Sequence, residues 1–262
     1  MSADTYTHGH HESVLRSHRW RTAENSAAYL LPHLRSGLTL LDAGCGPGNI
    51  TADLAGRVSP GRVLGIDASV DVIGAAARDY PGVAFETGDV YQLNFPDGSW
   101  DVVHAHQLLQ HVSDPVAALK EMRRVVKPGG IVAARDGDYG AFTWYPADDR
   151  LTRWLALYRD IARANRGEPD AGRFLLSWAQ QAGFSDIKAS ASVWCFATPQ
   201  DRAWWGGLWA DRITTSAIAH QAVREGRATA ADLASMADAW RQWAAASDGW
   251  FAVLHGEIIC TR

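Results

Sequence analysis

Three glycines at alternate positions, Gly44, Gly46 and Gly48, directly follow the apolar segment 38–43. Glycine has no Cβ atom, so the backbone there can turn sharply and approach a ligand closely. The spacing is GxGxG, whereas dinucleotide-binding loops carry GxGxxG. A glycine loop alone is weak evidence for a cofactor site, because glycines also form simple turns. The residues that follow it along the chain decide between the two interpretations.

Two aspartates stand near the ends of the next two predicted strands. Asp67 lies in the apolar segment 62–69, and Asp89 ends the segment 83–89. A carboxylate can accept hydrogen bonds from both hydroxyls of a ribose, and a second one can accept from an exocyclic amine such as that of adenine. This pair favours a ligand with a diol and an amine over a phosphate chain. The alternative for Asp89 is a helix or turn cap.

The elements that position these residues alternate between strand and helix. We predict strands over 38–43, 62–69, 83–89, 100–107 and 131–138, and helices over 49–58, 70–80 and 114–126. Strands that are apolar on both faces and alternate with helices form a parallel sheet covered on both sides. Ligands bind such sheets outside the carboxyl ends of the strands. The glycine loop and the two aspartates should therefore share one edge.

The pattern changes after Pro146. We expect helices over 148–166 and 171–182, a strand over 187–199, a helical block over 200–246 and a last strand over 249–262, with a further helix over 12–35. The expected organisation is an N-terminal helical arm or lid at 1–37, a Rossmann-like domain made of 38–199 and 249–262, and a helical insert at 200–248. In this architecture the insert lies over the mouth of the site.

Five segments between residues 36 and 136 resemble the successive motifs of class I S-adenosylmethionine (SAM)-dependent methyltransferases. They are DAGCGPG, GIDAS, GDV, DVVHAHQLLQHVSDP and LKEMRRVVKPGG. The most similar branch contains the ubiquinone and menaquinone biosynthesis methyltransferases. The resemblance implies a doubly wound, seven-stranded α/β sheet whose last strand is antiparallel. It also implies that a methyl group passes from SAM to an O, N or C atom of a small, aromatic or apolar acceptor.

The resemblance further implies roles for individual residues. Asp42, Gly44, Cys45 and Gly46 would line the methionine moiety of SAM, Asp67 and Ala68 the ribose, Asp89 and Val90 the adenine, and His106 with Gln107 the sulfonium end. In the N-terminal lid, Arg19 or Arg21 is expected near the SAM carboxylate. The alternative for these two arginines is a solvated helix face.

A base is needed when the acceptor carries a proton, as a phenol does. The candidates are His106, His111 and Asp138, the last in a loop after the fifth strand. Asp138 and its neighbour Asp136 could instead cap that loop or pair with Arg135. His104, His106 and His111 lie close together in the sequence, but no acidic or cysteine partner adjoins them, so we expect no metal site.

Composition excludes several other classes. The net charge of −4 argues against a nucleic-acid-binding protein. No window holds the roughly 18 apolar residues of a membrane span, and the N-terminal sequence lacks the apolar core of a secretory signal, so we expect a cytoplasmic protein. The N-terminal arm leaves homo-oligomerisation open.

Two alternatives to a methyltransferase remain. One is a SAM-binding enzyme of the same fold with cyclisation or reduction chemistry, and the other is a non-catalytic SAM-binding module.

Tryptophan is abundant for this length, with 12 residues, and most of them follow Trp144. Trp204, Trp205, Trp209, Trp240 and Trp243 recur at helical spacing in the predicted insert. Such a cluster forms either a bulky core or the wall of an aromatic pocket. We expect some of these side chains to line the acceptor site.

Overall fold

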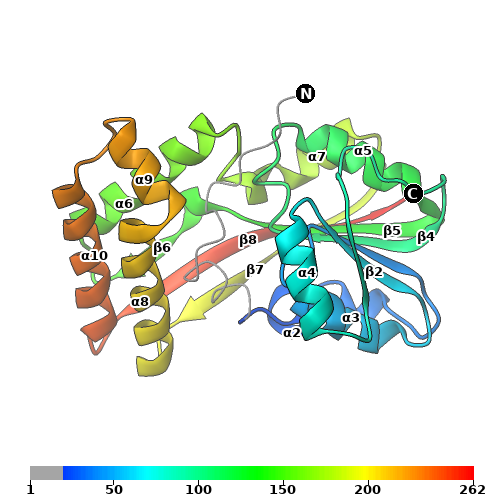
Figure 1. Cartoon of the computed structure of the whole chain (residues 1–262), viewed down its shortest axis with the longest axis horizontal. Coiled ribbons are helices and arrows are strands. Elements are labelled where there is room, and N and C mark those ends of the chain that lie inside the picture. Colours follow the sequence, from blue (N-terminus) through cyan, green and yellow to red (C-terminus); the bar gives the residue numbers. More distant parts are fainter. Residues whose placement is uncertain (1–19) are drawn as a thin grey trace.

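An eight-stranded sheet runs through residues 20–262, the part of the chain that the computed structural model describes (Figure 1). Its strands are β1 (Leu40–Ala43), β2 (Val63–Asp67), β3 (Ala84–Thr87), β4 (Trp100–His106), β5 (Val126–Gly137), β6 (Thr143–Tyr145), β7 (Asp186–Phe196) and β8 (Trp250–Thr261). The strand order is β3-β2-β1-β4-β5-β8-β6, with β7 paired to β8 along its other edge. Strands β1 to β5 are parallel, and β8 is antiparallel to its three neighbours.

The predicted α/β class and the antiparallel last strand are confirmed, but the sheet has one strand more than the seven predicted. The extra strand is β6, which pairs Thr143 with Ala252 and Tyr145 with Trp250 on β8. A three-residue strand is too short to show an alternating pattern in sequence. It forms because β8 is long and extends beyond the end of β5.

Helices cover both faces of the sheet. Helices α2 (Ala23–Ser26) and α3 (Asn49–Val58) pack on one face, and α5 (Pro115–Val125) and α7 (Leu175–Gln181) pack on the other (Figure 1). Leu40 and Leu41 are neighbours on β1, and their side chains point to opposite faces of the sheet, as those of successive strand residues do. Leu41 therefore packs in the core on one face and Leu40 in the core on the other. Helix α4 (Val70–Asp79) contacts β2 and β3. Its first turn is capped by Ser69, whose hydroxyl accepts from the Val72 N–H.

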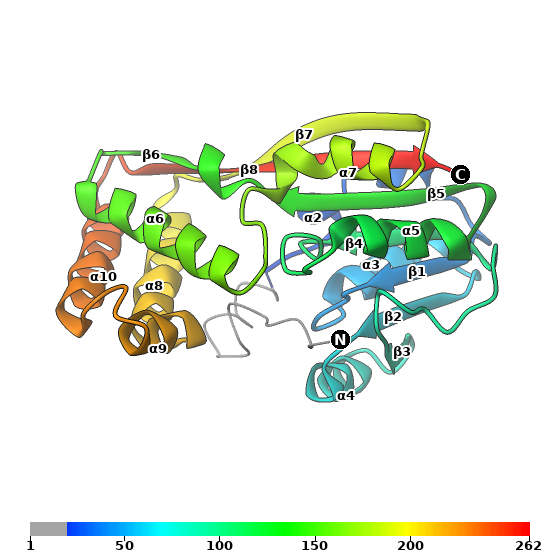
Figure 2. The same ribbon diagram turned by 90° about the horizontal axis from the view of Figure 1, so that it is seen from above.

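The remaining helices form a bundle at the far end of β8 (Figures 1 and 2). They are α6 (Asp149–Ala164), α8 (Pro199–Thr215), α9 (Ala217–Arg224) and α10 (Ala230–Ala245). Trp154 of α6 meets Trp209 of α8 and Trp240 of α10 edge to face, with ring centroids 4.5 and 4.8 Å apart. The predicted insert 200–248 therefore shares its core with α6. Two short 3-10 helices complete the fold, η2 (Tyr139–Ala141) and η3 (Ala171–Phe174), and both contact β8.

The helix predicted over 12–35 is wrong over its described part. That part contains only α2 and the 3-10 helix η1 (Leu31–His33). Thr22 caps α2 with a capping box, and the chain leaves helical geometry at Ala27. Pro32 lacks an N–H group and cannot continue an α-helix. Residues 1–19 of the predicted lid, Arg19 among them, lie outside the described residues. Within residues 20–262, no helix is long and apolar enough to cross a membrane.

Candidate active site

A cavity of ≈ 1130 Å³ opens at the carboxyl ends of β1, β2 and β4. It extends from these strand ends to the helical bundle, because Trp205 and Trp209 of α8 also line it. Single-ligand pockets usually enclose about 300–1,000 Å³. The cavity is therefore large enough for a cofactor and a second small molecule side by side.

The glycine loop forms the floor of this cavity at the end of β1. Gly44, Gly46 and Gly48 have φ angles of +71°, +54° and +84°, a region that favours glycine. A Cβ atom on Gly44 would lie 2.9 Å from the Leu108 side chain. The backbone angle thus favours glycine at position 44, and any larger residue would also displace the Leu108 side chain.

Asp67 and Asp89 both line the cavity beside this loop. Asp67 accepts from the Gly46 N–H at 3.1 Å and from the Ser69 N–H at 3.0 Å, so its carboxylate ties the glycine loop to the end of β2. Asp89 accepts from the Tyr91 N–H at 2.9 Å. It thus caps a local turn and faces the cavity as well.

Two side chains, Thr51 and His104, hold the carboxylate of Asp42 beneath the glycine loop at the end of β1. The carboxylate accepts from the Thr51 hydroxyl at 2.5 Å and lies 2.7 Å from Nδ1 of His104. His104 is fully buried, so it orients Asp42 from behind rather than lining the cavity. Among the described residues, no group of three potential ligands could hold a metal ion.

His106 ends β4 at the junction of the strand ends and the bundle. Its ring is buried and lines the cavity, and neither ring nitrogen has a hydrogen-bond partner among residues 20–262. The ring centroids of Trp194 and His255 lie 5.8 and 6.2 Å away. Burial, together with the charges of Arg21 and Arg135, holds the pKa of His106 well below its ordinary value. The imidazole is therefore neutral near pH 7, with one nitrogen able to accept a proton.

His111 and Gln107 line the cavity on either side of Leu108. Nε2 of His111 lies 3.0 Å from the Gln110 amide nitrogen, and burial, followed by the charge of Arg21, lowers its pKa to about 3. Gln107 has a φ of +51°, and its amide nitrogen lies 2.9 Å from Nε2 of His255. A non-glycine residue in this conformation is held there by its surroundings, which is common at functional sites.

Three histidines with lowered pKa values should make the fold sensitive to acid. The pKa values of His106, His111 and His255 are all lowered in the folded chain, first by burial. The unfolded chain takes up these protons near pH 6.5. As the pH falls from about 6.5 toward the folded pKa, the free energy of unfolding should fall by about 1.4 kcal/mol per pH unit for each histidine. Asp136 opposes this between about pH 4 and 7, because burial raises its pKa to about 7.

In His111→Gln, the unfolded chain takes up one proton fewer as the pH falls below about 6.5. We expect the slope of unfolding free energy against pH between 6 and 4.5 to decrease by about 1.4 kcal/mol per pH unit. The measurement is urea unfolding at a series of pH values. His220→Gln, at an exposed site on α9, is the matched control. An equal slope for His111→Gln and wild type would contradict the neutral state of the half-buried His111.

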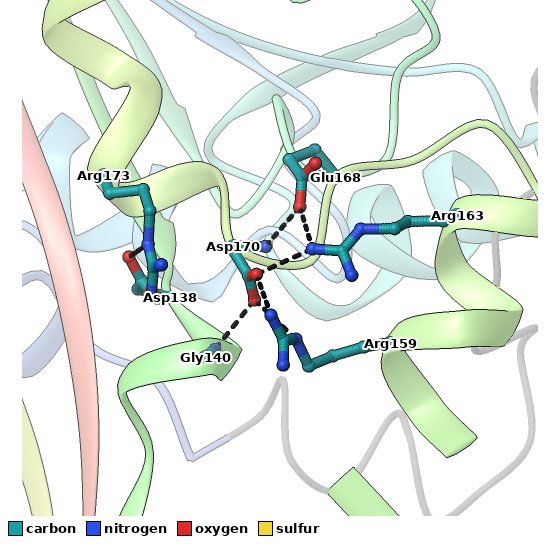
Figure 3. Close-up of polar contacts among 7 residues, drawn as sticks. All are labelled: Asp138, Gly140, Arg159, Arg163, Glu168, Asp170 and Arg173. Carbon is teal, nitrogen blue, oxygen red and sulfur yellow. Dashed lines mark hydrogen bonds and ion pairs between the residues drawn. The ribbon is translucent and has the colours of Figure 1, made fainter. Parts of the chain in front are cut away.

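The structure corrects the interpretation of Asp138. Its side chain does not line the cavity, and its carboxylate accepts from Nε and Nη2 of Arg173 at 2.7 and 2.5 Å (Figure 3). Asp138 is therefore a poor candidate for the base. The alternative pairing with Arg135 is also wrong, because Arg135 donates to Glu257 and Ser192 across the sheet. Asp136 accepts from the Gln110 N–H at 3.0 Å.

Aromatic side chains wall the half of the cavity next to the bundle, which we call the aromatic chamber. They are Trp20, Tyr139, Phe142, Trp194, Trp204, Trp205 and Trp209, joined by Arg166 and Arg212. Three of the tryptophans in the predicted insert thus line the cavity, whereas Trp240 and Trp243 lie in the core of the bundle. Trp194, Phe142, Arg166 and Arg212 were not predicted, because nothing in their local sequence distinguishes a cavity wall from a core.

A buried carboxylate, Asp170, holds the turn next to Tyr139 and α6 together (Figure 3). Asp170 accepts from the Gly140 N–H at 2.7 Å, from Nη2 of Arg159 at 2.5 Å and from Nη2 of Arg163 at 2.7 Å. Burial alone would raise the pKa of Asp170, but these hydrogen bonds hold it below its usual range. The charged carboxylate thereby joins α6 to the η2 turn that carries Tyr139.

Asp170→Ala should lower the free energy of unfolding by about 2 kcal/mol, since it leaves the Gly140 N–H and the Arg159 guanidinium without their acceptor, while Arg163 keeps Glu168 at 3.0 Å. The value is below that for a fully buried pair because Arg159 and Arg163 are 32% and 43% exposed and can turn to water. Urea unfolding measures it. Asp160→Ala, on the exposed face of α6, is the control, with an expected change within about 0.5 kcal/mol. Equal losses for the two variants would contradict the account of this network.

Known proteins share both the sequence and the fold. The family model for the methyltransferase domain matches residues 41–134. An uncharacterized methyltransferase of Schizosaccharomyces pombe is 33% identical over 97% of this chain and 95% of its own length. A probable methyltransferase of Aspergillus luteorubrus, ltbC, is 30% identical over 99% of this chain and 98% of its own length.

A solved structure of similar fold holds the demethylated cofactor. It is phosphoethanolamine N-methyltransferase 2 of Haemonchus contortus, in complex with phosphomonomethylethanolamine and S-adenosylhomocysteine. The TM-score is 0.56 at 18% identity, and the match covers 89% of this chain and 52% of that one.

Proposed function

Because the chain belongs to the family of SAM-dependent methyltransferases, we propose that it methylates an O, N or C atom of a small, apolar or aromatic acceptor bound in the aromatic chamber. One observation carries this proposal. A single cavity joins the glycine loop and its aspartates to a chamber walled by aromatic side chains, with His106 at the junction.

The chain's own residues fit SAM, which is the cofactor of this family. We assign Gly44, Cys45 and Gly46 to the methionine moiety, Asp67 and Ala68 to the ribose, and Asp89 and Val90 to the adenine. Asp42 positions the loop, and Arg21 supplies a cation for the amino-acid carboxylate. Support for the assignment comes from the cavity, because all of these side chains line it together with Gln107.

SAM supplies a methyl group on a positively charged sulfur, which needs no further activation. The chain must then hold the acceptor atom in line with that methyl group and exclude water. Orientation of this kind is worth up to roughly 7–11 kcal/mol of the barrier. The aromatic walls fix a flat acceptor, and the neutral His106 can accept the proton of an O–H or N–H group. His111, already beside Gln110, is the second candidate for that step.

We assign SAM binding to residues 38–199 and 249–262, and acceptor binding to the insert 200–248 with a contribution from α6. The N-terminal arm, 1–37, contributes Trp20 and Arg21 to the cavity. A cytoplasmic location and homo-oligomerisation stay predictions.

The test is turnover with methyl-labelled SAM against a panel of small aromatic and apolar acceptors. We expect a labelled product and one equivalent of S-adenosylhomocysteine (SAH) for at least one acceptor. A bulky side chain at Val253 of β8, which also lines the cavity, should block this turnover, as in Val253→Trp. Turnover of an acceptor without consumption of SAM, or methylation that Val253→Trp leaves unchanged, would contradict the proposal.

A further inference from the structure

His255 of β8 lies behind the cavity and uses both of its ring nitrogens. Its side chain is fully buried and does not line the cavity. Nδ1 lies 3.1 Å from the Val253 carbonyl oxygen, and Nε2 lies 2.9 Å from Nε2 of Gln107. A carbonyl oxygen can only accept, so the proton of the His255 ring is on Nδ1.

This proton position fixes the direction of the Gln107 amide. Burial, followed by the charges of Arg135 and Arg21, holds the pKa of His255 well below its ordinary value, so the ring is neutral near pH 7 and has a single N–H group. Nε2 then acts only as an acceptor, and Gln107 must turn its NH2 group toward it, because the reverse orientation would bring two lone pairs together. The carbonyl oxygen Oε1 of Gln107 therefore lies on the side of the amide away from His255.

The backbone also holds Gln107 in place. Its N–H group donates to the Arg135 carbonyl at 2.7 Å, and its φ is +51°. Gln107 lines the cavity, and within residues 20–262 its Oε1 atom accepts no hydrogen bond. The amide therefore offers a ligand in the cavity a fixed oxygen with a partial negative charge.

This oxygen belongs to the place where the strand ends meet the aromatic chamber. On one side Leu108, the next residue, packs against Gly44 of the glycine loop. On the other side the ring centroid of His255 lies 4.3 Å from that of Trp194 in the chamber wall. Methyl transfer requires the sulfur to lie at this boundary, between cofactor and acceptor. The neutral rings of His106 and His255 add no positive charge there.

We propose that His255 is a positioning residue that turns the Gln107 carbonyl oxygen toward the sulfonium of SAM, so that the site favours the charged substrate over SAH, the neutral product. This inference rests on the proposed function. SAM and SAH differ at the sulfur by one methyl group and one positive charge. The negative end of a fixed amide dipole stabilises the charged form, and a dipole already held in place needs no reorientation when the cation binds. The interaction is lost with the charge, so it favours the exchange of product for substrate.

Calorimetric titration of the whole chain with SAM and with SAH, without acceptor, tests the proposal. In Gln107→Met and Gln107→Ala, the Kd of SAM divided by the Kd of SAH should rise about tenfold over the wild type, the usual gain of a contact with a charged group. The Kd of SAH itself should stay within about threefold. Two side chains of different size separate the loss of the oxygen from a steric effect on the methyl group. Gln180→Met, at an exposed position of α7 outside the cavity, should keep the wild-type ratio.

The role of His255 is tested by removing the acceptor that orients the amide. His255→Leu should raise the ratio several-fold, and the double variant with Gln107→Met should show no further rise over Gln107→Met alone. Additive effects would mean that His255 acts on the site by another route, and would overturn its positioning role. Nitrogen-15 NMR of the histidine-labelled wild type reads the tautomer without any loss of stability. We expect a proton on Nδ1 of His255 alone, and a proton on Nε2 would overturn the proposal.

Failure of the wild type to bind SAM and SAH would contradict the proposed function itself. Binding of both ligands, with the wild-type ratio kept in the two Gln107 variants, would overturn only the inference about the amide. A ratio that rises in Gln107→Met but not in Gln107→Ala would assign the effect to side-chain size and overturn the inference as well.

Discussion

Replacing Asp67 with alanine should weaken the binding of SAM and SAH about 100-fold. A carboxylate that accepts two hydroxyl hydrogen bonds contributes on the order of 3 kcal/mol, and the variant also loses the acceptor for the Gly46 and Ser69 N–H groups. Calorimetric titration with SAH measures the effect. Asp67→Asn keeps one acceptor oxygen and should lie between the wild type and Asp67→Ala.

The matched control is Asp71→Ala, an exposed aspartate in the first turn of α4, only four positions further along the chain. It should bind SAH with wild-type affinity. If Asp71→Ala and Asp67→Ala lose affinity equally, the effect comes from overall negative charge near β2 and not from a contact with the ribose.

Replacing His106 with phenylalanine should lower kcat about 100-fold for an acceptor with an O–H or N–H group, at the lower end of what a positioned base contributes. An aromatic ring of similar shape still packs against Trp194, while both nitrogens are lost. The dissociation constant of SAH should stay within about threefold of the wild type. Single-turnover kinetics with labelled SAM separate this chemical step from product release.

His111→Phe is the decisive comparison, because both histidines line the cavity and both are neutral near pH 7. We expect its kcat to fall less than about tenfold, since the His111 ring already lies beside Gln110. A reversed order, with His111→Phe the slower variant, would assign the proton transfer to His111 and contradict the role of His106.

The residues at the strand ends of the cavity could be predicted because their signals are local. Glycines with positive φ, an aspartate at a strand end and a capped helix start each depend on a few neighbouring residues. The parallel sheet then brings the ends of β1, β2 and β4 to one edge. These residues were therefore identifiable from spacing and from the family motifs.

The aromatic chamber could not be predicted in the same way. Trp20, Phe142, Trp194 and Arg212 come from four separate segments and meet only in the folded chain. An alternating strand pattern does not tell which face of β7 meets a cavity. The partner of Asp138 likewise lies 35 positions away, at Arg173, so the loop sequence alone suggested a base, a cap or a pair with Arg135 where the fold forms an ion pair with Arg173.

The crystal structure of this chain with bound SAH tests the account most directly, because one cavity is claimed to hold the cofactor at its strand-end half and the acceptor at its aromatic half. The account predicts the ribose hydroxyls on Asp67, the adenine amine at Asp89, and the sulfur facing His106 and the aromatic chamber. Adenine stacked within the chamber, against Trp205 or Trp209, would contradict it, because no space for an acceptor would then remain beside the sulfur.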